Sequence, residues 1–179
     1  DRLENSLLPL CYGKEQIRSL PLCPGKDSVI RKYEIAAIQQ DIPYNKYGDH
    51  DPNGLLFVPT KDLEGVRCGK ILPKPLILRA NAGDWVEVTL HNLFEPGDSI
   101  PYFNYPIVPL DKEHTPSNRV SICPQFLKFD TTKDSGVNVG YNFYEQTVGP
   151  GESKKYLWYA DKEYGTCIIQ SFGDMRNHR

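Results

Sequence analysis

The chain alternates apolar and polar residues in several short runs, and this period of two predicts β-strands rather than helices. The clearest run lies at residues 85–90, where Val86, Val88 and Leu90 share one face. No spacing of 3.6 residues lasts beyond about two turns, so any helix is short. Further strands are expected at residues 29–42, 55–58, 76–78, 119–130, 155–159 and 167–172.

Turns separate these runs, because the chain holds 15 prolines and 14 glycines. Residues 44–54 carry loop residues throughout, and residues 81–84 form the turn of a predicted hairpin. We predict one all-β domain over residues 29–179, preceded by an irregular N-terminal arm at residues 1–28. A proline-rich insertion at residues 94–118 interrupts the domain, and a loop of that length is usually functional or packed against a neighbour.

Length and charge limit the classes of partner. At 179 residues the chain is long enough for one sizeable core. The net charge is −2 and the 21 Lys and Arg residues are scattered, so no nucleic-acid-binding surface is expected. No apolar run approaches the roughly 18 residues that a membrane-spanning helix needs, so no membrane span is expected.

The five cysteines form no Cys-x-x-Cys pair, which argues against a zinc ribbon or a thioredoxin-like redox site. Cys11 and Cys23 flank a turn-rich segment, and a disulfide between them would close a short loop, worth roughly 3 kcal/mol. Cys123 and Cys167 are either bridged to each other or two small buried thiols. Disulfide use favours a secreted, periplasmic or cell-surface location.

Three segments, in this order along the chain, carry a resemblance to the cupredoxin domains of multicopper oxidases. They read LILRANAGDWVEVTLHN at residues 76–92, GPGESKKYLWY at residues 149–159 and YGTCIIQSFGD at residues 164–174. Together with YNKYGDHDPNG at residues 44–54, the pattern is most similar to the first domain of the large bacterial multicopper oxidases that include manganese oxidisers. Ceruloplasmin and hephaestin are more distant relatives. The resemblance covers about residues 29–176 and implies a Greek-key cupredoxin-like β-sandwich.

The resemblance also marks the family's copper-ligand positions, and none of them holds histidine here. SICPQF at residues 121–126 stands where the family has Ser-Ile-His-x-His-Gly, which places Cys123 and Gln125 at two ligand positions. The second His-x-His pair of the family falls on Gln170 and Phe172. Because such copper sites need imidazole ligands, the resemblance implies four vacated positions and no catalytic residue in this chain.

A further expectation concerns the end of the fold. Family members continue into another strand that closes the sandwich, whereas this sequence ends at Arg179. Natural proteins avoid an open apolar edge. We therefore expect the sandwich to lack its closing C-terminal strand within this chain and another segment to supply it.

Residues 49–54 open like an EF-hand calcium loop, with Asp49, Asp51 and Asn53 at alternate positions before a glycine. The twelfth position of such a loop is Thr60 instead of glutamate. Two interpretations stay open, a weak calcium site or an Asx-rich turn between strands.

Two functions from different classes fit these observations. The resemblance implies a structural domain of a large multicopper oxidase, whose copper would be bound elsewhere and whose partners would be other cupredoxin domains or chains of the same protein. That parent protein would oxidise a metal ion such as Mn(II), or an organic reductant, and reduce dioxygen. The alternative is a non-enzymatic cupredoxin-like module used for assembly or adhesion at a cell surface or in a filament.

Overall fold

The computed structural model describes residues 24–95 and 117–174, and within these ranges the chain is built of strands with one short helix. The strands alternate with turns rather than with helices, as the period of two predicts. The elements are β1 (Ile30–Pro43), β2 (His50–Pro59), the 3-10 turn η2 (Thr60–Asp62), α1 (Leu63–Arg67), β3 (Trp85–Asn92), β4 (Cys123–Pro124), β5 (Lys128–Phe129), β6 (Ser153–Tyr159) and β7 (Ile169–Gln170).

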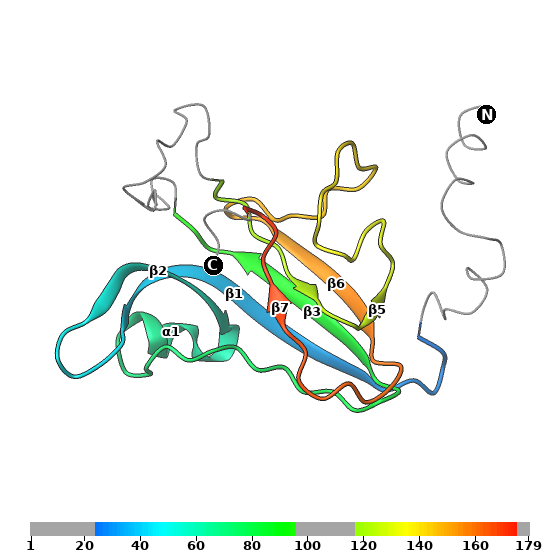
Figure 1. Cartoon of the computed structure of the whole chain (residues 1–179), viewed down its shortest axis with the longest axis horizontal. Coiled ribbons are helices and arrows are strands. Elements are labelled where there is room, and N and C mark those ends of the chain that lie inside the picture. Colours follow the sequence, from blue (N-terminus) through cyan, green and yellow to red (C-terminus); the bar gives the residue numbers. More distant parts are fainter. Residues whose placement is uncertain (1–23, 96–116, 175–179) are drawn as a thin grey trace.

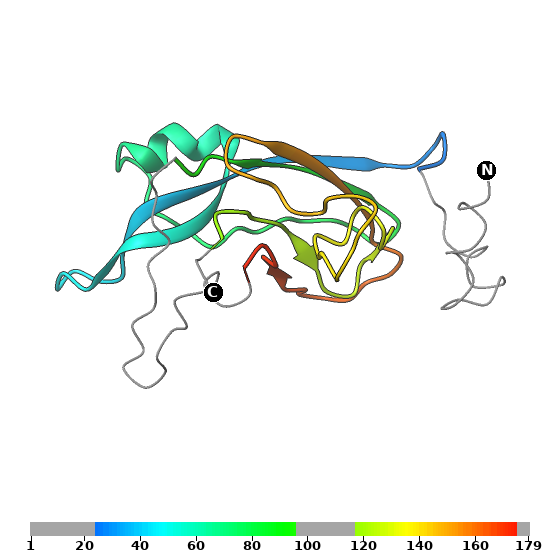
Figure 2. The same ribbon diagram turned by 90° about the horizontal axis from the view of Figure 1, so that it is seen from above.

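The strands form two sheets. A five-stranded sheet has the order β2-β1-β3-β6-β5, and a two-stranded sheet pairs β4 with β7. β1 and β3 run parallel, while the other pairs are antiparallel. Figures 1 and 2 show the long, curled strands in one layer and β7 in a second layer against one face of it. The all-β sandwich predicted from the sequence is therefore confirmed.

β1 is buried on both faces, which explains why its centre is continuously apolar. Ile35 and Ala37 belong to the main core between the two layers. Ala36 and Ile38, pointing the other way, pack against Val66 of α1. The main core also contains Val86, Val88, Leu90, Phe94, Val120, Ile122, Val148, Tyr156 and Trp158.

A glycine–aspartate turn ties the start of β3 to the end of β6. Gly83 has a φ of +91°, a conformation open to glycine, and its N–H donates to Ala160 O at 2.6 Å. The Asp84 carboxylate accepts hydrogen bonds from Arg31 Nε and from Asn81 N, the latter at 2.8 Å. These bonds, the Arg31 one above all, hold the pKa of Asp84 below its usual value.

The three long predicted strands are confirmed as β1, β3 and β6, but other boundaries were wrong. Residues 76–78 belong to no sheet, and residues 50–54, expected in a loop, extend β2. The strand expected at residues 119–130 is reduced to β4, β5 and one bridge between Val120 and Val148. The predicted N-terminal arm up to residue 23, with Cys11 and Cys23, lies outside the described residues. So does most of the predicted insertion, residues 96–116.

A buried glutamine fastens the long loop that precedes β6. Gln146 is 2% exposed. Its Oε1 accepts hydrogen bonds from Ser135 N at 2.9 Å, Ser135 Oγ at 2.5 Å and Gly136 N at 3.1 Å. Its Nε2 donates to Thr131 O at 3.0 Å. One side chain therefore closes the base of the loop on both sides.

The neighbouring carboxylate of Glu145 gives this loop a pH dependence. Partial burial opposes ionisation, but hydrogen bonds from Thr147 and Asn138 outweigh it and hold the pKa of Glu145 at about 2, against a usual 4.5. Because the folded-state pKa is depressed, the ionised group stabilises the fold above pH 4.5. That contribution is lost as the pH falls toward 2.

We expect Glu145→Gln to lower the free energy of unfolding at pH 7 by less than about 1 kcal/mol, since the side chain is 56% exposed and screened by water. The difference from the unchanged chain should shrink steadily below pH 4.5. Urea unfolding across this pH range measures it, with the exposed Glu163→Gln as control. A difference that stays constant with pH would contradict the assignment.

Candidate functional site

The four predicted ligand positions lie together at the small sheet. Cys123 on β4 stands directly opposite Gln170 on β7. Gln125 N donates to Ile168 O at 2.9 Å, and Phe172 N donates to Ser121 Oγ at 2.9 Å. Each of the two segments thus contributes two of the positions, two residues apart, in an antiparallel arrangement.

The side chains at these positions do not form a donor set that suits copper. They offer one thiol, two neutral amides and a phenyl ring, whereas copper in proteins is held mainly by imidazole and thiolate groups. The two histidines in the described ranges point to other partners: His50 Nδ1 lies 2.7 Å from Asp41 Oδ1, and His91 Nδ1 lies 2.6 Å from Ser153 Oγ. Over residues 24–95 and 117–174, no three His, Cys, Asp or Glu side chains form a group that could hold a metal ion.

Cys123, Cys167 and Cys68 carry free thiols in the described chain. Cys123 and Cys167 therefore form no disulfide with each other, and the interpretation as two separate thiols holds. Both are partly buried, and burial raises the pKa of the Cys123 thiol above its usual value. A protonated thiol is a weak ligand and a weak nucleophile.

Thiol labelling should separate these cysteines. Cys68 is exposed, whereas Cys123 is partly buried and held protonated, so at pH 7.5 we expect iodoacetamide to modify Cys68 at least about tenfold faster than Cys123. Peptide mapping by mass spectrometry at timed intervals measures both rates in one sample. Equal rates in the folded chain, and equal rates again in urea, would show that the fold does not shield Cys123.

The candidate calcium residues do not converge. Asp51 and Asn53 lie within β2, where Asp51 pairs with Ile42 of β1. Alternate residues of a strand are spread along it rather than gathered around a point. Asp51 Oδ1 accepts a hydrogen bond from Asn53 N at 3.0 Å, and Asp49 Oδ2 accepts one from Asn45 Nδ2 at 2.5 Å. Asp51 and Asn53 therefore belong to a strand, and only Asp49 lies in the loop that precedes it.

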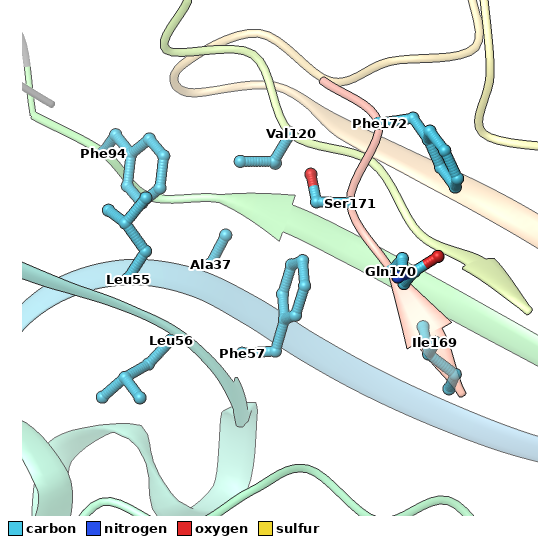
Figure 3. Close-up of a pocket in the computed structure, with 10 residues that line it drawn as sticks. All are labelled: Ala37, Leu55, Leu56, Phe57, Phe94, Val120, Ile169, Gln170, Ser171 and Phe172. Carbon is cyan, nitrogen blue, oxygen red and sulfur yellow. The ribbon is translucent and has the colours of Figure 1, made fainter. Parts of the chain in front are cut away.

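An apolar groove follows the side of β7 that faces away from β4, and the sequence did not predict it. Its volume is about 350 Å³. Residues 55–57 of β2 form one wall and residues 169–172 the other, with Ala37 and Phe94 between them. Figure 3 shows the Phe57 ring standing between the β2 and β7 backbones. Only the packing of the two sheets brings these walls together, so no pattern within a short stretch of sequence predicts the groove.

Comparisons with known proteins found a likeness among solved structures. No protein-family model matches the chain, and no curated protein is similar to it in sequence. Among solved structures, the chain is similar to the copper nitrite reductase from Nitrosomonas europaea, with 19% identity and a TM-score of 0.41. The aligned region covers 74% of this chain and 31% of the nitrite reductase chain. The all-β fold class rests on the strands and sheets described above.

One structural finding bears on membranes. In the described parts of the chain, no helix has the length and apolar character needed to cross a bilayer.

Proposed function

We propose that this chain is a structural, cupredoxin-type domain of a larger multicopper oxidase and does not itself ligate copper. The copper would be held by other domains or chains of that protein, where a reductant such as Mn(II) or an organic molecule is oxidised and dioxygen is reduced. The location would be secreted, periplasmic or at the cell surface. The catalytic residues and the copper ligands would lie outside residues 1–179.

One observation carries this proposal. The four positions that the resemblance assigns to imidazole ligands lie at or beside β4 and β7, and they hold Cys123, Gln125, Gln170 and Phe172. Gln125 and Gln170 are exposed amides, Phe172 offers no donor atom, and the Cys123 thiol is disfavoured from ionising. Strands that pair in this way without metal-ligand side chains suit a domain whose role is to pack against the neighbouring domains of the protein.

The experiment is a copper assay on the intact protein and on a matched Cys123→Ser variant. We expect the intact protein to contain copper, to show the visible absorption of a Cys-ligated copper centre, and to keep its copper content and oxidase rate within about twofold in the variant. Absence of copper from the intact protein would reject the oxidase assignment. Loss of copper on Cys123→Ser alone would place a ligand in this domain and reject its structural role.

The alternative, a non-enzymatic assembly module, is favoured by a different observation. The loop fastened by Gln146 presents three side chains to solvent, Val139, Tyr141 and Phe143, which are 75%, 100% and 85% exposed. Clustered exposed apolar residues often mark protein interfaces. In that case the intact protein would assemble without copper, and a Tyr141→Ser, Phe143→Ser double variant would lower its assembled fraction at least about tenfold in sedimentation.

A further inference from the structure

Phe126, which follows β4, has an unfavourable backbone conformation. Its φ is +66°, and within residues 24–95 and 117–174 every other residue with a positive φ is a glycine. In this left-handed region the Cβ of an L-residue crowds the following carbonyl oxygen, a contact that glycine avoids. Phenylalanine also lacks the short polar side chain with which asparagine or aspartate offsets that cost. Glycine would therefore cost less at this position.

Burial of the Phe126 ring does not offset this cost. Phe126 is 66% exposed, so its ring gains little from the core. The ring stacks on that of Tyr164, with centroids 6.0 Å apart and planes 20° apart, and such a contact is individually modest. A residue in an unfavourable conformation that adds little packing marks a candidate functional position. We call the rings of Phe126 and Tyr164 the aromatic platform.

Polar contacts hold the Tyr164 ring and form a border around the aromatic platform. The Tyr164 hydroxyl donates to Asp161 Oδ1 at 2.6 Å, and Lys128 Nζ lies 3.0 Å from Asp161 Oδ2. Lys162 Nζ lies 5.1 Å from the centre of the Tyr164 ring. The two rings are therefore held in place, and they lie beside both ammonium and carboxylate groups.

The combination of stacked rings and polar border indicates the chemistry of the ligand. A pyranose ring has a flat face of C–H groups, which packs on the negative face of an aromatic ring. The hydroxyls around that face donate to carboxylates and accept from ammonium groups. Asp161, Lys128 and Lys162 supply both kinds of group. A sugar therefore uses the rings and the border together.

The charges near the aromatic platform disfavour a nucleic acid, the other polymer that stacks on aromatic rings. Tyr164 borders a hollow of about 960 Å³, whose charged lining residues are Lys74, Arg79, Lys162 and Glu163. Single-stranded nucleic acids bind along a continuous basic groove. Here an acidic group lies among the basic ones, and the whole chain has a net charge of −2. We propose that the aromatic platform binds a pyranose ring of a carbohydrate, which stacks on Phe126.

This inference goes beyond the proposed function, because it holds whether or not the intact protein contains copper. The probes are neutral cellohexaose and acidic hexagalacturonate, each titrated into the isotope-labelled chain and followed by NMR. We expect at least one of them to shift the Phe126 and Tyr164 signals saturably, with a dissociation constant below about 1 mM. Lys74 and Arg79 would favour the acidic probe, and added salt should weaken that preference. Failure of both probes to bind at about 10 mM would overturn the proposal.

The matched variants are Phe126→Gly and Phe126→Ala, which both remove the ring, although only glycine also relieves the backbone. We expect each to weaken binding at least about tenfold. The glycine variant should melt about 2–4 °C above the alanine variant. Phe126→Tyr keeps a ring and should bind within about threefold of the unchanged chain. Tyr47→Ala removes a tyrosine that is 81% exposed elsewhere, and it should change the affinity less than about twofold.

Three results would overturn the proposal even if a sugar binds. The first is binding that persists in both ring-free variants, since the sugar would then lie elsewhere. The second is tighter binding of a thymidine oligonucleotide than of either sugar, which would assign the aromatic platform to nucleic acid. The third is self-association of the chain that Phe126→Ala abolishes, which would assign Phe126 to a protein contact. Equal melting of the glycine and alanine variants would remove the backbone argument on which the proposal rests.

Discussion

Replacing Gln146 with leucine is expected to lower the free energy of unfolding by about 3–5 kcal/mol. Leucine nearly fills the space of glutamine but accepts and donates no hydrogen bond. The substitution leaves the buried groups Ser135 N, Ser135 Oγ and Gly136 N without their Gln146 partner. Thr131 O also loses its bond, but Thr131 is exposed to water. Each buried polar group left without a partner costs about 1–3 kcal/mol, and water entering the loop relieves part of that.

The backbone around Gln146 leaves little room for water to enter and replace the lost hydrogen bonds. Gly136 has a φ of +69°, and a Cβ there would lie 2.3 Å from Ile122 O, so the loop backbone lies directly against the buried residue Ile122. Gln146 O also accepts the Tyr156 hydroxyl at 2.6 Å, and burial, with the nearby Glu145 and Asp134, raises the pKa of that tyrosine. This main-chain bond survives in the leucine variant. The fold is therefore expected to persist with a loosened loop rather than to collapse.

Urea unfolding monitored by circular dichroism measures the effect, and Gln125→Leu is the matched control. Gln125 is exposed, so the same substitution there should change the free energy of unfolding by no more than about 0.5 kcal/mol. A loss below about 1 kcal/mol for Gln146→Leu, at an unchanged slope against urea, would show that the buried hydrogen bonds are replaced by water at little cost.

The long strands could be predicted because their information is local. β1, β3 and β6 each alternate or carry a continuous apolar run, and the Gly83-Asp84 turn has a residue type suited to its positive φ. The error at residues 76–78 has the same origin. Three apolar residues satisfied the strand pattern, but they lie against the core without a neighbouring strand in the described chain, since Leu76 and Leu78 pack on it while Ile77 is 68% exposed.

Some features of the candidate site could likewise be predicted from the sequence, and others could not. The resemblance marked Cys123 and Gln170 as vacated ligand positions, but it did not give their pairing across β4 and β7, which the structure supplies. The Gln146 network escaped prediction, because a buried glutamine and a solvated one look alike in sequence. The apolar groove beside β7 escaped it as well, since its walls at β2 and β7 are distant in the chain. Such features depend on tertiary packing, which no short window of sequence contains.

The second large effect is a gain of metal affinity. Cys123→His combined with Gln170→His is expected to bind Ni(II) about 100-fold more tightly than either single variant. Directly opposed residues of a hydrogen-bonded antiparallel pair have Cα atoms about 5.5 Å apart and side chains on one face. Two imidazoles at Cys123 and Gln170 can therefore share one ion. Imidazole is a suitable ligand for nickel, and this ion avoids the thiol oxidation that Cu(II) would cause.

The measurement is thermal and urea stability with and without Ni(II), because a ligand bound only by the folded state stabilises it. At 100 times the dissociation constant the gain is about 2.7 kcal/mol, and it should vanish as the histidines protonate below about pH 6. The matched control is Cys123→His with Ile169→His, whose second imidazole points to the opposite face of β7. If that control binds as tightly as the facing pair, the register of β4 and β7 is not the one described. If only the facing pair gains affinity, the backbone of β4 and β7 holds residues 123 and 170 close enough for two imidazoles to share one ion. The native side chains alone would then explain why this sheet does not bind the metal.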